Sequence, residues 1–239
     1  MSTYLPINLP SRCLVYDGVK QDDVKIRAYQ GQDEVYLSQI NPKNLEKNYF
    51  EVLHNLIQGV DPLKLTLGDR MYIIIWECIN SYSNLIKVNT ICSHCLNEEI
   101  VSVDLSNFDV TELPKDFEQP YTIDLSTGEK IRLQLLTVAD DIKTEQYSVG
   151  HEDSMLYRYA RSVVTDADIL QTLEQFRSLP AKDFLRIVAW HEKFFHGPVM
   201  ESAFTCSKCD KEDKVEVPFR FSFFFPDGSE LEEFFGQGI

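Results

Sequence analysis

Hydrophobic and polar positions follow a helical spacing in one stretch of the chain and a strand spacing in the next. Between residues 45 and 60 apolar side chains recur every three or four positions, which predicts an amphipathic helix that ends at Gly59. A second helix is predicted to begin at Thr66, because a hydroxyl at the N-cap and Asp69 three residues later suit the amides of a first helical turn. Its core face is Leu67, Met71, Ile74, Ile75, Cys78 and Ile79.

Two stretches show the alternation that is typical of strands. Residues 86–105 alternate on both sides of a Cys-x-x-Cys pair, which predicts a strand, a tight knuckle and a second strand. Nearer the N-terminus, Asp17-Gly18 lies between apolar stretches, and this dipeptide favours a hairpin turn. We therefore expect a hairpin there, with strands at 14–16 and 24–27.

The second half of the chain repeats this order of elements. A hairpin is predicted at 121–133, around a Ser-Thr-Gly turn. Helices are then predicted to begin near Thr137, Glu152, Thr165 and Pro180. The last helix ends at Gly197-Pro198, and strands flank a second Cys-x-x-Cys pair.

The two halves also agree in spacing, which indicates a duplicated unit. The matching segments are Lys25-Ile26-Arg27 with Lys130-Ile131-Arg132, Cys95 with Cys209, and Val101 with Val215. In both halves the valine follows the cysteine by six residues.

We therefore predict an α+β fold of two related halves packed about a pseudo-twofold axis. Each half consists of a β-hairpin, helices and a Cys-x-x-Cys knuckle hairpin. The predicted boundaries are an N-terminal half at 1–106, a linker at 107–119, a C-terminal half at 120–225 and an acidic, aromatic tail at 226–239. The linker is assigned because Pro114 and several acids interrupt the periodicity.

Four of the six cysteines form the two pairs, and they are the candidate metal ligands. They are Cys92, Cys95, Cys206 and Cys209. Zinc prefers tetrahedral thiolate sulfur, and a Cys-x-x-Cys turn supplies two sulfurs close together. The 110 residues between the pairs exceed the spacing of a continuous zinc ribbon. Duplication resolves this difference if the halves pack about a pseudo-twofold axis, because equivalent knuckles are then expected to meet there and to share one structural zinc.

The cysteines and histidines have possible roles other than zinc ligation. A catalytic dithiol places a reactive cysteine at the start of a helix, whereas both pairs precede polar turns and valine-containing strands. His94 lies inside the first knuckle and is an alternative ligand, although a solvent-facing turn residue is the simpler interpretation. His191 and His196 are predicted to pack among aromatic residues. Cys13 and Cys78 lie among apolar residues and are predicted to be small core side chains.

Composition narrows the classes of function. The 239 residues are 44% hydrophobic and 26% charged, which is typical of a globular protein, and the net charge of −15 repels phosphate backbones and anionic lipids. The longest apolar run, Met71 to Trp76, is far shorter than a membrane span, and no signal segment is recognised, so we expect a cytoplasmic protein. No phosphate-binding loop, nucleophile elbow or His-Glu-x-x-His motif occurs. We therefore expect no enzyme, no small-molecule substrate, no nucleic acid and no membrane partner.

Phenylalanines are concentrated near the C-terminus. Phe219, Phe221 and Phe223 alternate as one face of a strand and are predicted to fill the core beneath the second knuckle. The candidate partner-binding residues are Phe224, Phe225, Phe234 and Phe235. They are predicted to form an exposed patch beside an acidic rim, because exposed aromatic patches mark protein–protein contacts.

Several motifs resemble the T-even-type phage baseplate protein family, which includes baseplate hub and hub-assembly proteins. They are Gly59-Val60-Asp61-Pro62, Leu65-Thr66-Leu67-Gly68-Asp69-Arg70, Leu125-Ser126-Thr127-Gly128-Glu129-Lys130 and both cysteine pairs, over roughly Pro6 to Phe225. The resemblance implies a tail-morphogenesis protein without enzymatic chemistry that binds baseplate hub or other tail proteins. It implies either a hub component of the virion baseplate or a chaperone-like assembly factor in the host cytoplasm.

The alternative interpretation is a zinc-ribbon regulator that binds nucleic acid or polymerase. Such a protein needs a basic patch beside the knuckles. The acids that follow the two pairs are Glu98, Glu99, Asp210, Glu212 and Asp213.

Overall fold

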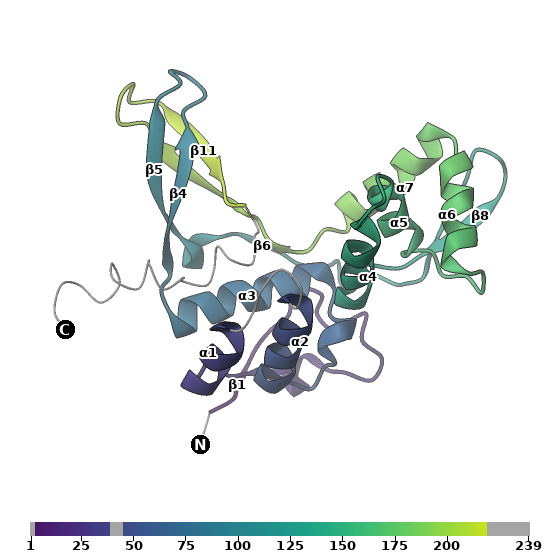
Figure 1. Cartoon of the computed structure of the whole chain (residues 1–239), viewed down its shortest axis with the longest axis horizontal. Coiled ribbons are helices and arrows are strands. Elements are labelled where there is room, and N and C mark those ends of the chain that lie inside the picture. The colour runs from purple at the N-terminus through teal and green to yellow at the C-terminus, as the bar shows by residue number, and fades with distance from the viewer. Residues whose placement is uncertain (1–2, 39–44, 219–239) are drawn as a thin grey trace. The chain divides into compact units, whose positions relative to one another are not determined.

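The computed structural model describes residues 3–38 and 45–218, and its chain divides into two compact units (Figure 1). The helical unit comprises Met1–Arg70 and Thr111–Gly197, and the hairpin unit comprises Met71–Val110 and Pro198–Ile239. Each unit therefore takes one segment from each of the two predicted halves. The boundaries of those halves, and the pseudo-twofold axis between them, stay predictions.

The N-terminal part of the helical unit is a small antiparallel sheet with helices. Its elements are β1 (Leu5–Pro6), a 3-10 turn (Gln21–Asp23), β2 (Lys25–Ile26), α1 (Gly31–Ser38), α2 (Leu45–Leu56), β3 (Ile57–Gln58), a second 3-10 turn (Pro62–Lys64) and the start of α3 (Leu67–Ser81). The sheet order is β1-β2-β3, with Ile26 opposite both Leu5 and Ile57. The two predicted helices are confirmed as α2 and α3.

The hairpin predicted at Asp17-Gly18 is wrong. Residues 10–18 form turns and a bend rather than a strand, and β2 pairs with β1 and β3. Arg12 and Cys13 adopt left-handed φ values of 55° and 56° within these turns. The local Asp-Gly signal is therefore overridden by contacts to a residue far along the chain.

That residue is Asp69, which is completely buried in the first turn of α3. Its carboxylate accepts hydrogen bonds from the backbone N–H of Ser11 at 2.8 Å and from the hydroxyl of Tyr16 at 2.5 Å. A buried carboxylate needs such donors, because desolvation without them is costly. The turns at residues 10–18 bring both donors to one side chain, five residues apart in sequence.

The C-terminal part of the helical unit contains the predicted hairpin and four helices. They are β7 (Tyr121–Asp124), β8 (Lys130–Leu133), α4 (Val138–Ser148), α5 (Ser154–Ala160), α6 (Ile169–Ser178) and α7 (Ala181–Lys193). Thr137 caps α4 as predicted, through reciprocal hydrogen bonds with Asp140. The core of this part is Leu113, Phe117, Leu133, Leu135, Ala160, Phe176, Ile187 and Trp190.

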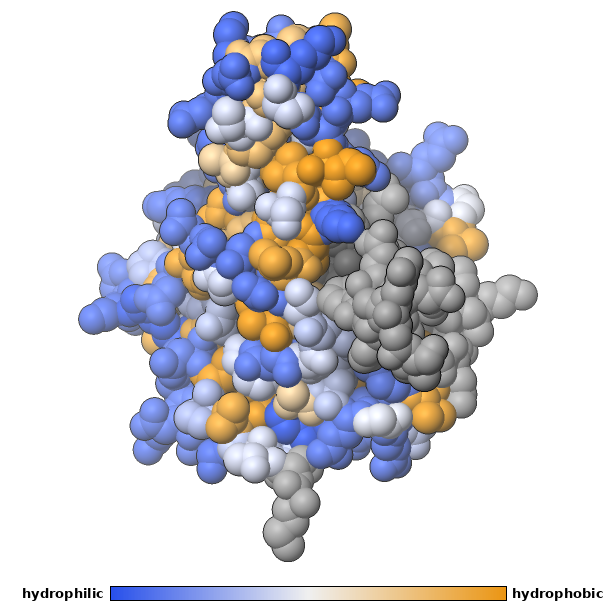
Figure 2. Space-filling view, turned by 90° about the vertical axis from the view of Figure 1, so that its left-hand side faces the viewer, coloured by the Kyte–Doolittle hydropathy of each residue, from blue (hydrophilic) through white to orange (hydrophobic). Residues whose placement is uncertain are grey.

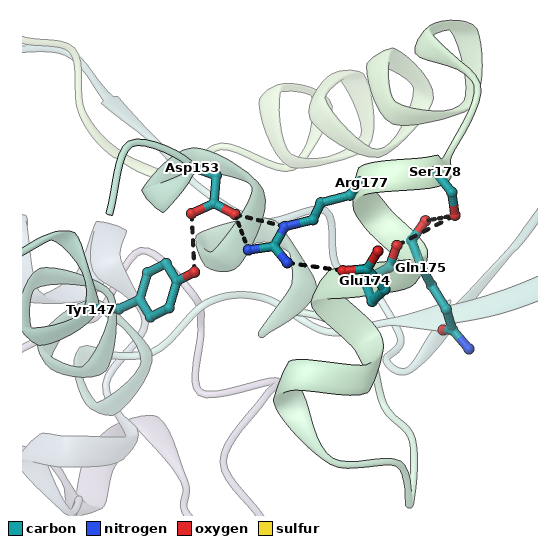
Figure 3. A network of polar contacts seen from close by, with 6 residues as sticks. All are labelled: Tyr147, Asp153, Glu174, Gln175, Arg177 and Ser178. Atoms are coloured by element: carbon teal, nitrogen blue, oxygen red, sulfur yellow. Dashed lines mark hydrogen bonds and ion pairs between the residues drawn. The ribbon is translucent and has the colours of Figure 1, made fainter. Parts of the chain in front are cut away.

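A polar network centred on Asp153 links α4, α5 and α6 (Figure 3). Arg177 of α6 donates from Nε and Nη2 to one oxygen of Asp153, the N-cap of α5, at 2.9 and 2.7 Å. Tyr147 of α4 donates to the other oxygen of Asp153 at 3.0 Å. The hydrogen bonds from Arg177 hold the pKa of Asp153 below its ordinary value. One carboxylate therefore links three helices.

The hairpin unit consists of the remainder of α3 and two antiparallel hairpins. Its strands are β4 (Leu85–Ile91), β5 (Glu98–Asp104), β10 (Glu201–Thr205) and β11 (Glu212–Glu216), with a 3-10 turn at Leu105–Asn107. The two-residue strands β6 (Val110–Thr111) and β9 (Gly197–Pro198) lie where the chain passes from one unit to the other. β4 pairs with β5, β6 with β9, and β10 with β11. The strands predicted around both cysteine pairs are confirmed. In Figure 2 the hairpin tips are largely hydrophilic, and hydrophobic residues gather lower on the hairpins.

No helix among residues 3–38 and 45–218 is long and apolar enough to cross a membrane.

Candidate metal centre

The first knuckle is the loop between β4 and β5. Cys92 uses both of its backbone groups here, since its N–H donates to the carbonyl of Asn97 at 2.9 Å and its carbonyl accepts from the N–H of Leu96 at 2.9 Å. Leu96 closes the loop in the left-handed region, with φ at 58°. These hydrogen bonds fix the backbone of the cysteine pair.

The second knuckle, between β10 and β11, repeats this pattern 114 positions later. The N–H of Cys206 donates to the carbonyl of Lys211 at 3.0 Å, and the carbonyl of Cys206 accepts from the N–H of Asp210 at 3.0 Å. Asp210 adopts φ at 54°, close to the value of its counterpart. The two knuckles therefore have the same hydrogen-bonded backbone.

The four predicted cysteines meet in one cluster. The Sγ atoms of Cys92 and Cys209 lie 3.8 Å apart, those of Cys95 and Cys206 lie 3.6 Å apart, and all four lie within 4.8 Å of one another. A tetrahedral zinc with Zn–S bonds of about 2.3 Å has S–S edges of about 3.8 Å. A disulfide requires about 2.05 Å, and all four thiols are free. The cluster fits a tetrahedral ion, and its ligation of zinc stays a prediction.

Burial differs in the same way within each pair. The first cysteine, Cys92 or Cys206, is completely buried, whereas the second, Cys95 or Cys209, is half-buried. Each of the two short S–S contacts joins a buried thiol of one knuckle to a half-buried thiol of the other. Four sulfurs complete a tetrahedral shell, which is the arrangement of structural rather than catalytic zinc sites.

Two reciprocal serine–carboxylate contacts hold the knuckles against each other. The backbone N–H of Ser93 donates to the carboxylate of Asp213 at 2.7 Å. The backbone N–H and hydroxyl of Ser207 both donate to the carboxylate of Glu99 at 2.9 Å. The two serines and the two acids are each 114 positions apart, so the contact is reciprocal. Sequence reasoning treated these acids only as local charge, although each stands seven residues after the first cysteine of its pair.

The thiols differ in acidity. Burial, together with the hydrogen bond that the thiol donates to Glu99 at 3.2 Å, raises the pKa of Cys206 to about 12. The pKa of Cys95 is lowered, chiefly because the backbone N–H of Asn97 bonds its sulfur. Metal binding replaces these protons, so it releases them to solvent.

The remaining candidates lie elsewhere. His94 places Nε2 at 3.2 Å from the carbonyl of Glu212 and does not belong to the sulfur cluster. His196 is buried in the helical unit with Nε2 at 2.6 Å from the hydroxyl of Thr66. Burial raises the pKa of Cys13 to about 11 and that of Cys78 to about 12, as expected of core thiols. The four candidate partner-binding phenylalanines, at 224, 225, 234 and 235, lie outside the described residues, as do Phe219, Phe221 and Phe223.

Comparison with known proteins gives one match. The model of a family described as T4 bacteriophage base plate protein matches residues 11–226, which is most of the chain. No curated protein and no solved structure matches the chain.

Proposed function

The chain belongs to the T4 bacteriophage base plate protein family, and on that premise we propose that it acts in phage tail morphogenesis as a baseplate hub component or a hub-assembly factor. It works through contacts with hub or other tail proteins, and one zinc ion holds its hairpin unit together. Catalysis has no part in this role.

The geometry of the four thiols is the observation that supports the zinc. Two knuckles with the same backbone hydrogen bonds place Cys92, Cys95, Cys206 and Cys209 within 4.8 Å of one another. Zinc is the common ion for four thiolates in tetrahedral arrangement. The ion supplies no reaction in this role. It joins the segment that ends at Val110 to the segment that begins at Pro198.

Charge favours a protein partner over nucleic acid. Residues 92–100 and 206–214 together hold five acids against three lysines, and four zinc-bound thiolates add further negative charge. A nucleic-acid-binding ribbon needs the opposite sign at this place. The zinc-ribbon regulator therefore stays the weaker alternative, and the phenylalanine quartet at 224–235 stays a proposed contact for tail proteins.

The proposal is tested by comparing purified phage particles with infected-cell lysate. A phage that lacks the chain is expected to produce tails arrested at the baseplate stage, and resupplying the chain from a plasmid restores them. Mass spectrometry then assigns the role: presence in particles identifies a virion component, and presence in the lysate alone identifies an assembly factor. Normal yields of infectious particles without the chain contradict the proposal.

Zinc is tested separately by elemental analysis of the purified full chain. One zinc per chain is expected for the wild type, and less than a tenth of that for the Cys92→Ser variant. The Cys13→Ser variant serves as the matched control and retains the ion. Absence of stoichiometric metal from freshly purified wild-type chain contradicts the zinc assignment and leaves the tail-assembly role to the first experiment.

A further inference from the structure

The two knuckles provide an internal comparison, because their structures match and their exposed chemistry does not. Positions 114 apart have the same burial class almost throughout β4–β5 and β10–β11. Both hairpins have the same register, with Ile91 opposite Glu98 in the first and Thr205 opposite Glu212 in the second. At a position where folding dictates the residue, both hairpins are expected to carry the same kind of side chain.

Three exposed positions break this agreement. The first hairpin carries Ile91, Leu96 and Ile100, which are 60%, 77% and 71% exposed. The second hairpin carries Thr205, Asp210 and Lys214 at the equivalent positions, and these are exposed too. The fold therefore accommodates polar or charged residues at all three positions, and packing does not account for the apolar ones.

Leu96 strengthens this argument through its backbone. It holds φ at 58°, a region that disfavours residues with a Cβ and that glycine, asparagine and aspartate tolerate best. The second knuckle has Asp210 there, in agreement with this preference. A leucine at this position is both strained and exposed, so neither the backbone conformation nor packing accounts for its side chain.

Strand pairing places two of the three residues on one surface. Ile100 lies opposite Asn89, and Ile91 lies opposite Glu98, so the two isoleucines are diagonal neighbours on the same face of the β4–β5 ladder. Side chains at such diagonal positions are close enough for one partner residue to contact both. Glu98 shares this face and adds a carboxylate beside the apolar surface.

We propose that the two isoleucines, together with Leu96 of the adjoining knuckle loop (the apolar knuckle face: Ile91, Leu96 and Ile100), dock an apolar segment of another tail protein that also carries lysine or arginine. The inference rests on the proposed function and names the surface that performs it. The first hairpin, residues 85–104, holds one lysine, Lys87, against three acids, Glu98, Glu99 and Asp104. The whole chain carries a net charge of −15.

The negative charge of the hairpin favours a partner with basic residues. A basic flank is attracted to the acidic hairpin, whereas a second copy of the chain brings the same negative hairpin and is repelled. The apolar residues supply the buried contact, and the charges supply orientation and rate of association. The second hairpin, residues 201–216, holds three lysines, Lys208, Lys211 and Lys214, among its five acids, and it lacks the apolar residues at the equivalent positions.

The test transplants the second knuckle onto the first. The variant Ile91→Thr, Leu96→Asp, Ile100→Lys carries residues that the same backbone already accepts, so it is expected to fold and to bind zinc as the wild type does. The matched control changes the second hairpin conservatively, as Thr205→Ser, Asp210→Asn, Lys214→Arg. Tail proteins of the same phage, purified one by one, are titrated calorimetrically against each zinc-loaded full chain.

At least one tail protein is expected to bind the wild type and the control equally and the transplanted variant at least tenfold more weakly, with affinity falling as salt rises. Equal binding to all three chains overturns the docking surface and leaves the proposed function standing. If no tail protein binds the wild type, both fail. A wild type that dimerises in sedimentation equilibrium, with a monomeric transplanted variant, also overturns the proposal, because the occupant is then a second copy.

Discussion

The Cys206→Ser substitution tests whether one ion holds the hairpin unit together. Cys206 is completely buried, and its sulfur lies 3.6 Å from that of Cys95 in the opposite knuckle. A serine hydroxyl has nearly the same shape as a thiol but is a poor zinc ligand at neutral pH. The substitution therefore removes a sulfur ligand while it leaves the backbone of the knuckle in place.

The size of the effect follows from the length of chain that the ion closes. Cys95 and Cys206 are 111 residues apart in sequence. A cross-link that closes a loop of about 100 residues stabilises the folded state by about 4.7 kcal/mol in the chain-entropy model. Loss of the ion is therefore expected to lower the free energy of unfolding by roughly 4–5 kcal/mol, a large fraction of the 5–15 kcal/mol typical of a domain.

The assay is guanidinium unfolding followed separately by tryptophan fluorescence and circular dichroism, with zinc in one series and a strong chelator in the other. Wild-type chain is expected to lose about 4–5 kcal/mol on chelation, whereas the Cys206→Ser variant gives the same low value in both series. Cys78→Ser is the control, because this buried thiol lies outside the sulfur cluster. It lowers stability by removing a core group, yet its zinc dependence stays at the wild-type level.

Two results refute this reasoning. One is a Cys206→Ser variant that still binds one zinc per chain and unfolds as the wild type does. The other is a wild-type chain whose unfolding is unchanged after elemental analysis shows that the metal has been removed.

Three further predictions follow from the described contacts. In the zinc-stripped chain at pH 7.5, iodoacetamide is expected to modify Cys95 before Cys78, because the lowered pKa of Cys95 leaves more thiolate while burial raises that of Cys78 to about 12; peptide mass spectrometry showing the reverse order contradicts this. Gly68→Ala is expected to destabilise the chain by more than about 2 kcal/mol, because its Cβ would lie 1.9 Å from the backbone oxygen of His196, whereas Gly31→Ala meets nothing within 4 Å and changes thermal unfolding little. Asp69→Ala is expected to cost about 3 kcal/mol, because it leaves the buried donors of the N-terminal turns unpaired; a denaturation midpoint equal to that of the wild type contradicts this.

Local signals predicted the elements that local interactions decide. The cap at Thr137, the strands beside both cysteine pairs and the helix after Pro180 depend on neighbours within a few residues, and the structure contains all of them. The helix at Gly31–Ser38 was not predicted, because its apolar periodicity is weak. Its first turn is held by Asp33, which forms a buried ion pair with Arg27 at 2.6 Å.

Long-range contacts account for the wrong hairpin prediction and for the contacts that were not predicted. The Asp17-Gly18 hairpin failed because a carboxylate more than 50 residues away binds Ser11 and Tyr16. The crossed contacts of Glu99 and Asp213 were missed for the same reason, since an acid near a cysteine is common and its partner lies on the other hairpin. The two cysteine pairs are separated by 110 residues in sequence. Their meeting was nevertheless predicted, because the similar spacing of the two parts of the chain indicated that the pairs are equivalent.

Matching contacts are also found outside the knuckles, and this bears on where function lies. Asp183, in the first turn of α7, accepts from the N–H of Ser126 at 3.0 Å, as Asp69 in the first turn of α3 accepts from the N–H of Ser11 at 2.8 Å. Each acid precedes the first cysteine of its own half by 23 residues, which is the agreement that a duplicated unit predicts. The two parts of the chain thus share a buried acid that accepts from a serine N–H and the same knuckle backbone. Where the knuckles differ at exposed positions, folding does not explain the choice of residue, so those positions are the ones to search for contacts with the rest of the baseplate.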